Sequence, residues 1–456
     1  MVELTDGALR EAFAEAGDFT ARQLCVAGQR VVLYAIDGLT SGSDISEYVV
    51  RPLLSMQGKT MRELYHKAFY TAVYNSVAAP CVTLEDAVAK LLNGFCLVLF
   101  PGVGGLVFED KTGEKRSPSP PEVENTIKGP KDAFTETVRT NTSLLRRHLR
   151  TPRLKLKELV VGQESHTNVT VAYLEGHTPA QWTEKVIDRL EALEIPELLS
   201  PAAIEEYLTG ARATAFPLAQ YTQRPDKFAQ GLLQGQVGVL VDGLPSGYLL
   251  PVSFGALMKT PEDRGNNYIV ASFLRVLRYG ALLISLFLPG LYIGITTFYP
   301  EMIPNPLLTA IIESKQNVPF PTVFEVLALL LAFELLQQAG LSLPQSIGQT
   351  LSIIGGLVVG TAAVEARLLS PAALIVAATA GISGFVLPGR ELADALRLWR
   401  LVLAVCASFA GLFGMTAAFL ALILRLSRLE SLGCPYLAPF SRGRAEILRK
   451  RLKDME

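Results

Sequence analysis

Residues 279–424 carry only twelve charged side chains, whereas the first 278 residues of the chain are as polar as an ordinary soluble protein. Two stretches in this region, 279–299 and 401–424, contain no charged residue at all. Each is long enough to cross a bilayer as a helix, which takes about 20 consecutive apolar residues. The sequence therefore predicts a membrane protein with a large soluble head, and functional residues are expected among the few carboxylates of the apolar half.

The charges that flank the apolar half predict its orientation. The N-terminal residues, MVELTDGALREAFAEAGDF, are acidic and lack the apolar segment of a signal peptide. Only Glu301 closely follows the first apolar stretch, whereas four basic residues precede it, namely Lys259, Arg264, Arg275 and Arg278. Because basic residues accumulate on the cytoplasmic side, we expect the head and the basic tail 441–456 in the cytoplasm and an even number of crossings.

Five apolar segments are candidates for crossing the membrane: 279–299, 321–339, 347–366, 369–389 and 401–424. Five crossings would leave the basic tail outside, so one segment must fail to span. The segment 321–339 contains Glu325 and Glu334, and a carboxylate at the bilayer centre costs about 2.5–3.5 kcal/mol on insertion scales. We therefore expect a polytopic α-helical membrane domain with about four spans, in which 321–339 is a re-entrant or interfacial helix on the outer side.

The head alternates strand-like and helix-like segments, which indicates an α/β fold. Residues 30–36, 95–100 and 105–108 are typical of strands, and 84–92 and 135–150 of helices. The stretch KRSPSPPEVENTIKGP (115–130) is a linker by composition. We predict two small cytosolic α/β subdomains, 1–125 and 126–255, a helical transmembrane domain, 256–440, and a basic cytosolic tail, 441–456. No strong internal repeat is evident, and the five scattered cysteines are expected to be reduced.

The two carboxylates of 321–339 are candidates for a vestibule or for gating. Glu325 and Glu334 are nine residues apart, about 900° around a helix, so they lie on opposite faces and cannot form a dyad. Each is expected to face its own partner or water. They could attract or gate cations, or they could simply be solvated acids of an interfacial helix. Glu365, beside Arg367, would lie at the cytoplasmic mouth of the next segment.

Residues 345–367 have one face of small and weakly polar side chains. Its candidate pore-lining residues are Gln349, Ser352, Gly356, Gly360 and Ala363. Gly356 and Gly360 form a GxxxG motif, which commonly serves close helix packing. In a ring of subunits the same face would leave an open lumen. Both interpretations stay open, and they can hold together on adjacent faces.

Several classes of function find no support in the sequence. A net charge of −1 without a basic stripe argues against nucleic-acid binding. The four histidines lack the spacing of metal ligands, and no motif for a nucleotide, a nucleophile or a zinc site occurs. We therefore expect no catalytic residue, no metal and no cofactor. A secondary transporter would show inverted repeats, and none is evident.

The chain resembles the GerA family of spore germination proteins, specifically the A subunit of nutrient germinant receptors. The resemblance covers about residues 30–440 and rests on VDG (241–243), KTPED (259–263), FLRVLRY (273–279), LPGLY (288–292), TTFYPEMIP (296–304), VPFP (318–321), LPQSIG (343–348), AAVE (362–365), PYLAPF (435–440), and, in the head, GPKDAF (129–134), RTN (139–141) and QYTQRP (220–225).

The resemblance implies a subunit of the spore inner membrane that acts with a transporter-like B subunit and a lipoprotein C subunit. It also implies a homo-oligomer, a pentamer in this family, that conducts cations when nutrient is sensed. A close paralogue, the stage V sporulation protein AF, shares these motifs and amplifies ion release. A membrane-anchored signalling scaffold without a pore is the alternative that the residues themselves leave open.

Overall fold

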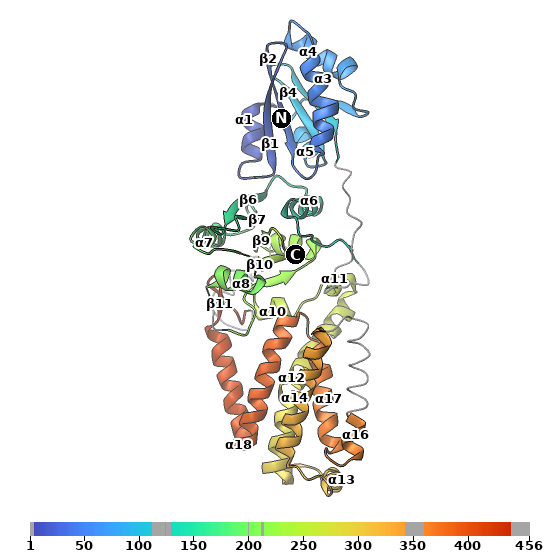
Figure 1. Ribbon diagram of the computed structural model, residues 1–456, viewed down its shortest axis with the longest axis vertical. Coiled ribbons are helices and arrows are strands. Elements are labelled where there is room, and N and C mark those ends of the chain that lie inside the picture. The colour runs from blue at the N-terminus through green and yellow to red at the C-terminus, as the bar shows by residue number, and fades with distance from the viewer. Residues whose placement is uncertain are drawn as a thin grey trace. The chain divides into compact units, whose positions relative to one another are not determined.

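The computed structural model describes residues 4–111, 124, 129–198, 200–210, 214–342 and 360–438. The chain divides into two compact units (Figure 1). The first, which we call the head, comprises Met1–Arg212 and Leu218–Val252. The second, which we call the helical unit, comprises Ala213–Pro217 and Ser253–Glu456. This division agrees with the expected α/β head and α-helical membrane part.

The first subdomain of the head is one antiparallel sheet between two layers of helices. Its sheet has the order β1-β2-β4-β5-β3. The elements are α1 (Asp6–Ala12), β1 (Phe19–Val26), β2 (Gln29–Ile36), α2 (Gly42–Asp44), η1 (Ile45–Val50), α3 (Arg51–Ser55), α4 (Met61–Lys67), η2 (Ala68–Ala72), β3 (Ala78–Cys81), α5 (Leu84–Leu91), β4 (Phe95–Phe100) and β5 (Gly104–Glu109).

Strand β2 shows why this sheet lies in the middle of its subdomain. Successive side chains of a strand point to opposite faces. Leu33 packs into a core with Val49 and Leu64 from the helices of one face. Its neighbour Tyr34 packs into a separate core with Leu9 and Leu91 from the other face. The run of apolar residues that predicted a strand here is therefore buried on both sides.

The second subdomain has the same kind of architecture. Its sheet has the order β6-β7-β9-β10-β8, and Phe228 and Leu232 of α9 pack with Leu145 of α6 over one face. The elements are α6 (Val138–His148), β6 (Leu154–Val161), β7 (Thr167–Leu174), α7 (Ala180–Glu191), α8 (Pro201–Thr209), β8 (Gln220–Thr222), α9 (Pro225–Leu233), β9 (Val237–Val241) and β10 (Gly247–Leu250).

The two subdomains repeat one topology. Each begins with a helix and a hairpin, continues through helices to a short edge strand, and ends with a helix and a second hairpin. Both strand orders are equivalent, and all pairs are antiparallel. The register agrees as well: Leu99 pairs with Gly105 in one sheet, and Leu240 pairs with Gly247 in the other. The expectation of no internal repeat is therefore wrong.

The repeat left a short trace in the sequence. The residues LLNG (91–94) and LLQG (232–235) stand at the same point, between the last helix and the second hairpin of each subdomain. Both terminal glycines adopt a left-handed backbone, with φ of 82° at Gly94 and 86° at Gly235. Only glycine adopts this conformation freely, so the same turn requires a glycine in both subdomains.

The helical unit contains three helices long enough to cross a membrane, within the residues that the structure describes: α12 (Tyr268–Phe298), α14 (Thr322–Ser342) and α18 (Arg390–Arg428). A shorter apolar helix is α17 (Pro371–Phe385). The remaining elements are α10 (Phe254–Leu257), α11 (Glu262–Gly265), η3 (Pro300–Met302), α13 (Asn305–Lys315), α16 (Gly360–Glu365), β11 (Glu430–Ser431) and β12 (Cys434–Pro435). The expected number of four spans stays a prediction.

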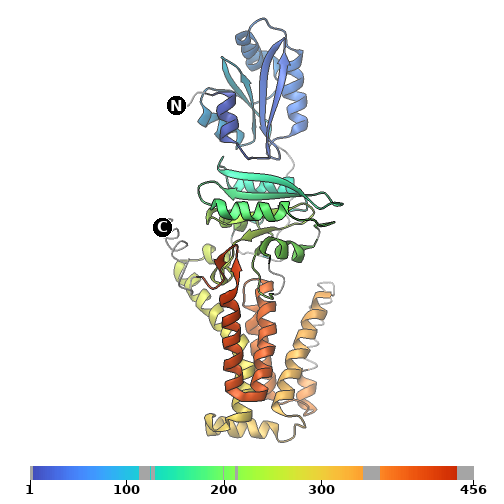
Figure 2. The ribbon, with the colours of Figure 1, turned by 90° about the vertical axis from the view of Figure 1, so that its left-hand side faces the viewer.

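Helix α18 corrects the expectation of one straight span over 401–424. Ala410 and Gly411 have non-helical backbone angles, with φ of 58° at Gly411. Figures 1 and 2 show the parts on either side of this turn as two adjacent arms that run in opposite directions. Each arm, 390–409 or 412–428, is about 25–30 Å long at 1.5 Å per residue. A helical hairpin thus occupies a stretch that composition alone presents as one helix.

Helix α14 corrects a second expectation. The structure has one continuous helix over Thr322–Ser342, and it packs alongside α17 and α12. This continuous helix is long enough to cross a membrane, so a re-entrant segment is wrong for these residues. The expectation failed because it treated Glu325 and Glu334 as uncompensated charges, whereas both have partners from other helices, as described below.

Close packing in this unit uses a GxxxG motif that the sequence analysis did not consider. Gly290 and Gly294 of α12 face the α18 hairpin: a Cβ at Gly294 would lie 3.3 Å from Gly411, and one at Gly290 would lie 3.2 Å from the sulfur of Met415. Small residues at this spacing let helix backbones approach each other in a membrane. The motif therefore packs helices here within one chain.

The turn of α18 yields a testable prediction. A Cβ at Gly414 would lie 2.2 Å from the backbone oxygen of Cys406, an atom that no side-chain movement can displace. We expect Gly414→Ala to open the hairpin or to destabilise the protein by about 1–3 kcal/mol, the usual cost of overpacking. The control is Gly381→Ala in α17, where a Cβ meets nothing within 4 Å.

Thermal unfolding in detergent measures both variants. Cysteine labelling from the two sides of the membrane adds a topological measurement, because the hairpin requires Arg390 and Arg428 on one side and Ala410 on the other. Equal stability of the two alanine variants, or labelling of positions 390 and 428 from opposite sides, would contradict the hairpin.

Candidate functional site

Four residues surround the carboxylate of Glu325 in α14. They are Tyr292 in α12, Lys315 in α13, Thr322 in α14 and Ser370, which caps α17. We call these five residues the Glu325 cluster. Glu325 is fully buried. Its Oε2 accepts hydrogen bonds from the backbone N–H of Ser370 at 2.9 Å and from the Ser370 hydroxyl at 2.6 Å. Its Oε1 lies 3.2 Å from the Lys315 ammonium, which also donates to the Thr322 hydroxyl.

The carboxylate of Glu334 has different partners, on α18, and we call this group the Glu334 cluster: Glu334, Gln337, Asp394, Arg397 and Arg400. Arg400 donates to Glu334 Oε1 at 2.7 Å and to the carbonyl oxygen of Ala380 in α17 at 3.3 Å. Arg397 donates to Glu334 Oε2 at 3.2 Å and also contacts Gln337 and Asp394. Arg400 is 2% exposed and the Glu334 side chain 24%, so a buried guanidinium with a partly buried counter-charge links three helices.

The two clusters change the interpretation of the two carboxylates of α14. Each carboxylate has its own charged partners, which is one of the two outcomes that the sequence left open, the other being water. At 1.5 Å per residue they lie about 13–14 Å apart along the helix, so they act at different depths of the unit. Each cluster balances negative with positive charge, which removes most of the cost of placing an ion in an apolar medium. The charges Arg390 to Arg400, which look like an exposed loop in the sequence, are the first turns of α18.

The candidate pore-lining residues fall largely outside the described residues: Gln349, Ser352 and Gly356 do so. Gly360 and Ala363 lie on α16, and a Cβ at Gly360 would lie 3.7 Å from Leu374 of α17, an ordinary packing contact. Glu365 ends α16, five residues before Ser370, and so lies at the same end of the unit as Glu325. The expectation that Glu365 and Glu325 lie at opposite mouths is therefore wrong.

A third ion pair fixes the start of α12. Arg278, 7% exposed, donates to both oxygens of Asp263 at 2.7 and 2.8 Å and to the Thr260 hydroxyl at 2.8 Å. Burial raises the pKa of Asp263, but hydrogen bonds from Arg278 and Thr260 outweigh that effect and hold it below its usual value. These residues belong to the KTPED and FLRVLRY segments, to which the sequence analysis assigned no role.

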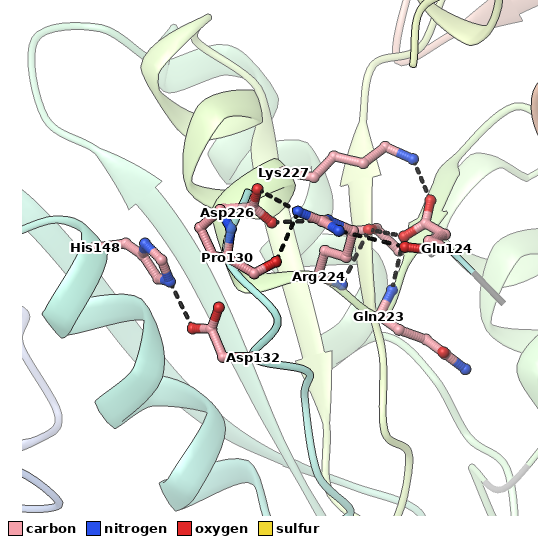
Figure 3. Close-up of polar contacts among 9 residues, drawn as sticks. Glu124, Pro130, Asp132, His148, Gln223, Arg224, Asp226 and Lys227 are labelled. Atoms are coloured by element: carbon pink, nitrogen blue, oxygen red, sulfur yellow. Dashed lines mark hydrogen bonds and ion pairs between the residues drawn. The ribbon is translucent and has the colours of Figure 1, made fainter. Parts of the chain in front are cut away.

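In the head, the main polar cluster surrounds the buried Arg224 (Figure 3). Arg224 donates to Asp226 and to the carbonyl oxygens of Pro130 and Glu124. The Glu124 carboxylate in turn accepts from Lys227, Thr222 and the N–H of Gln223. Nearby, a hydrogen bond with His148 holds the pKa of Asp132 below its usual value. The cluster attaches the chain that enters the second subdomain to β8 and α9, which is a structural role.

Among the described residues, no three His, Cys, Asp or Glu side chains are placed to hold a metal ion together. The free thiols lie apart, and burial raises the pKa of Cys81 to about 12, so this thiol is protonated at neutral pH. Within the described part of the helical unit, the buried charges are paired between helices.

Comparisons with known proteins find relatives over most of the chain. The model of the GerA family, described as Bacillus/Clostridium GerA spore germination protein, matches residues 7–455. Spore germination protein B1 of Bacillus subtilis is 34% identical over 90% of this chain and 85% of its own length. Spore germination protein A1 of the same organism is 35% identical over 79% of this chain and 75% of its own. The uncharacterized membrane protein YfkQ is 34% identical over 92% and 81%.

One solved structure also aligns with the chain: the N-terminal domain of the A subunit of the Bacillus megaterium spore germinant receptor GerK3. It covers 54% of this chain and 93% of that domain, with a TM-score of 0.42 and 23% identity.

Proposed function

Since the chain belongs to the GerA family of spore germination proteins, we propose that it is a membrane subunit of a spore germinant receptor. In this proposal, copies of the chain assemble around a cation path that opens when nutrient is sensed. The assembly lies in the spore inner membrane with both ends of the chain in the cytoplasm. It works with a transporter-like B subunit and a lipoprotein C subunit, and it catalyses no reaction.

The family match over residues 7–455 carries the receptor role, since relatives named spore germination proteins align over most of their length. One observation supports a path between copies rather than within one. The carboxylates Glu325 and Glu334 are both neutralised inside their own chain. The small, weakly polar face expected over 345–367 is the part of the chain that would line the lumen in a ring.

A bulky residue in the lumen tests the channel. We expect Ser352→Phe or Gly356→Leu to reduce nutrient-triggered ion release at least about tenfold while the complex still assembles, because the side chain narrows a pore without breaking a subunit contact. Gly381→Leu, at a helical glycine with open space around it, is the control for added bulk. Ion release from spores and the size of the purified complex are measured together.

The opposite result identifies the alternative function. If Gly356→Leu abolishes assembly, this face packs against other helices. The contact between Gly360 and Leu374 favours that interpretation at the described end of the face. The protein would then be a membrane-anchored signalling scaffold. A variant that assembles and releases ions normally contradicts both the lumen and the packing role of this face.

A further inference from the structure

The Glu325 cluster contains a buried carboxylate oxygen that takes part in no hydrogen bond with the described residues. Glu325 Oε1 makes no hydrogen bond with any described residue, and the Lys315 ammonium at 3.2 Å is its charged neighbour. The hydroxyl of Tyr292 is buried beside Glu325 and interacts with the Ser370 hydroxyl. A buried polar atom without a partner is unusual and marks a place where a partner can bind.

The lysine that balances Glu325 is held weakly. Lys315 is the last residue of α13, and within the described structure none of the residues of α13 is buried. Its side chain is 21% exposed, whereas the Glu325 side chain is fully buried. Helix α13 can therefore move away with little loss of packing, but Glu325, held by the capping residue Ser370, cannot follow it.

Departure of Lys315 would leave a carboxylate without a counter-charge in an apolar medium, which is strongly unfavourable. The carboxylate must then take up a proton or bind another cation. The cavity left by the ammonium is lined by oxygens of the kind that alkali ions use: one carboxylate oxygen of Glu325 and the hydroxyls of Thr322 and Tyr292, with the Ser370 hydroxyl bound to the other carboxylate oxygen.

We infer that Glu325, Thr322, Ser370 and Tyr292 form a binding site for a monovalent cation, and that Lys315 fills this site when no cation is bound. A single positive charge matches the single carboxylate and the ammonium that now occupies the position. Calcium and magnesium are excluded by the same count, because their sites combine more oxygen ligands and usually more carboxylates. This inference is independent of whether the assembly conducts ions, because binding of a cation to Glu325 requires no pore.

A substitution that removes the Lys315 ammonium should leave the site open to a cation from solution. Full-length protein is purified in detergent, and its thermal midpoint is compared in potassium chloride and in choline chloride of equal ionic strength, because choline is too large for the cavity. For Lys315→Met we expect potassium to raise the midpoint saturably by roughly 3–4 °C over choline. The wild-type midpoint should rise much less than that of Lys315→Met, since Lys315 competes with potassium for the site.

The matched control is Lys315→Met with Glu325→Gln, which keeps the volume and the bond to Ser370 but removes the negative charge. Its midpoint should be the same in both salts. A potassium response in this double variant overturns the site, and so does the absence of a response in Lys315→Met. A proton-only site is also distinguished: low pH in choline would then restore Lys315→Met while potassium at neutral pH would not.

A measurement on the unmodified protein covers the case in which Lys315→Met does not fold. A bound cation displaces Lys315 into solvent, so its acylation by an amine reagent, followed by mass spectrometry, should be faster in high potassium than in choline. Lys259, an exposed lysine of the same unit, should react equally in both salts. Equal rates at Lys315 in the two salts would contradict the exchange.

Discussion

Glu334→Gln is expected to destabilise the helical unit by up to about 3–5 kcal/mol, the range for breaking a buried ion pair by removing one partner, because Arg400 is buried although Glu334 is 24% exposed. The substitution keeps the shape of the side chain but removes the only carboxylate, among the described residues, that Arg400 contacts. Arg400 is 2% exposed and would remain charged, because an arginine does not release its proton in proteins. The lost stability is therefore the cost of a buried, uncompensated guanidinium.

The two arginines should respond differently to a second substitution. Arg397 is 20% exposed on its side chain and keeps Asp394 as a partner when Glu334 is neutral. Arg400 has no such alternative among the described residues. Glu334→Gln with Arg400→Met should therefore recover more stability than Glu334→Gln with Arg397→Met. Equal recovery, or wild-type stability of Glu334→Gln alone, would show that the Glu334 cluster does not hold these helices together.

The chain offers a local probe for this measurement. It has two tryptophans, Trp182 in α7 of the head and Trp399 in α18, next to Arg400. In a Trp182→Phe background, the fluorescence of Trp399 reports the unfolding of the helical unit alone. Ion release from spores carrying Glu334→Gln adds the functional measurement: normal release with unchanged cation preference would remove Glu334 from the candidate site residues.

The parts of the fold that sequence predicts well are those whose physical signal is local. The apolar run of β2 and the pair β4–β5 were expected from 30–36, 95–100 and 105–108, and the helix α5 from 84–92. In each case, a continuous apolar stretch or a helical periodicity is long enough to stand out. Strand β8, which has three residues, and β1, which is half exposed, give no comparable signal.

The candidate site shows the opposite case, because its contacts join distant residues. Glu334 meets Arg397 and Arg400 across more than 60 positions, and Glu325 meets Ser370 across 45. A single sequence carries no information on such pairs, and carboxylates that look isolated in it argue against a span. The turn at Ala410–Gly411 was missed for a related reason: two small residues inside an apolar run look like the interior of one helix.

The second large effect is expected in the head, at the ion pair between its two subdomains. Arg146 of α6 donates to both oxygens of Asp18, at 2.7 and 2.8 Å, and to the backbone oxygen of Thr151 at 3.2 Å. The two side chains are 0% and 1% exposed. Asp18→Asn should therefore cost about 3–5 kcal/mol, because Arg146 loses its counter-charge in a place that water does not reach.

A second pair across the same two subdomains serves as the matched control. Arg139 lies 3.1 Å from Asp37, but their side chains are 37% and 51% exposed. Asp37→Asn should change the stability by less than about 1 kcal/mol, as is usual for exposed pairs. The denaturant unfolding of the full chain, followed by Trp182 in a Trp399→Phe background, measures both variants.

The same argument predicts that a second substitution restores stability at the Asp18 site, which a purely steric explanation does not predict. Asp18→Leu with Arg146→Met removes both charges and fills most of their volume with apolar groups, and such replacements are often neutral or stabilising. The double variant should therefore be far more stable than Asp18→Asn, although it carries more substitutions at the same place. If it is instead the less stable of the two, hydrogen bonding by Arg146, including its bond to Thr151, outweighs the cost of burying the ion pair.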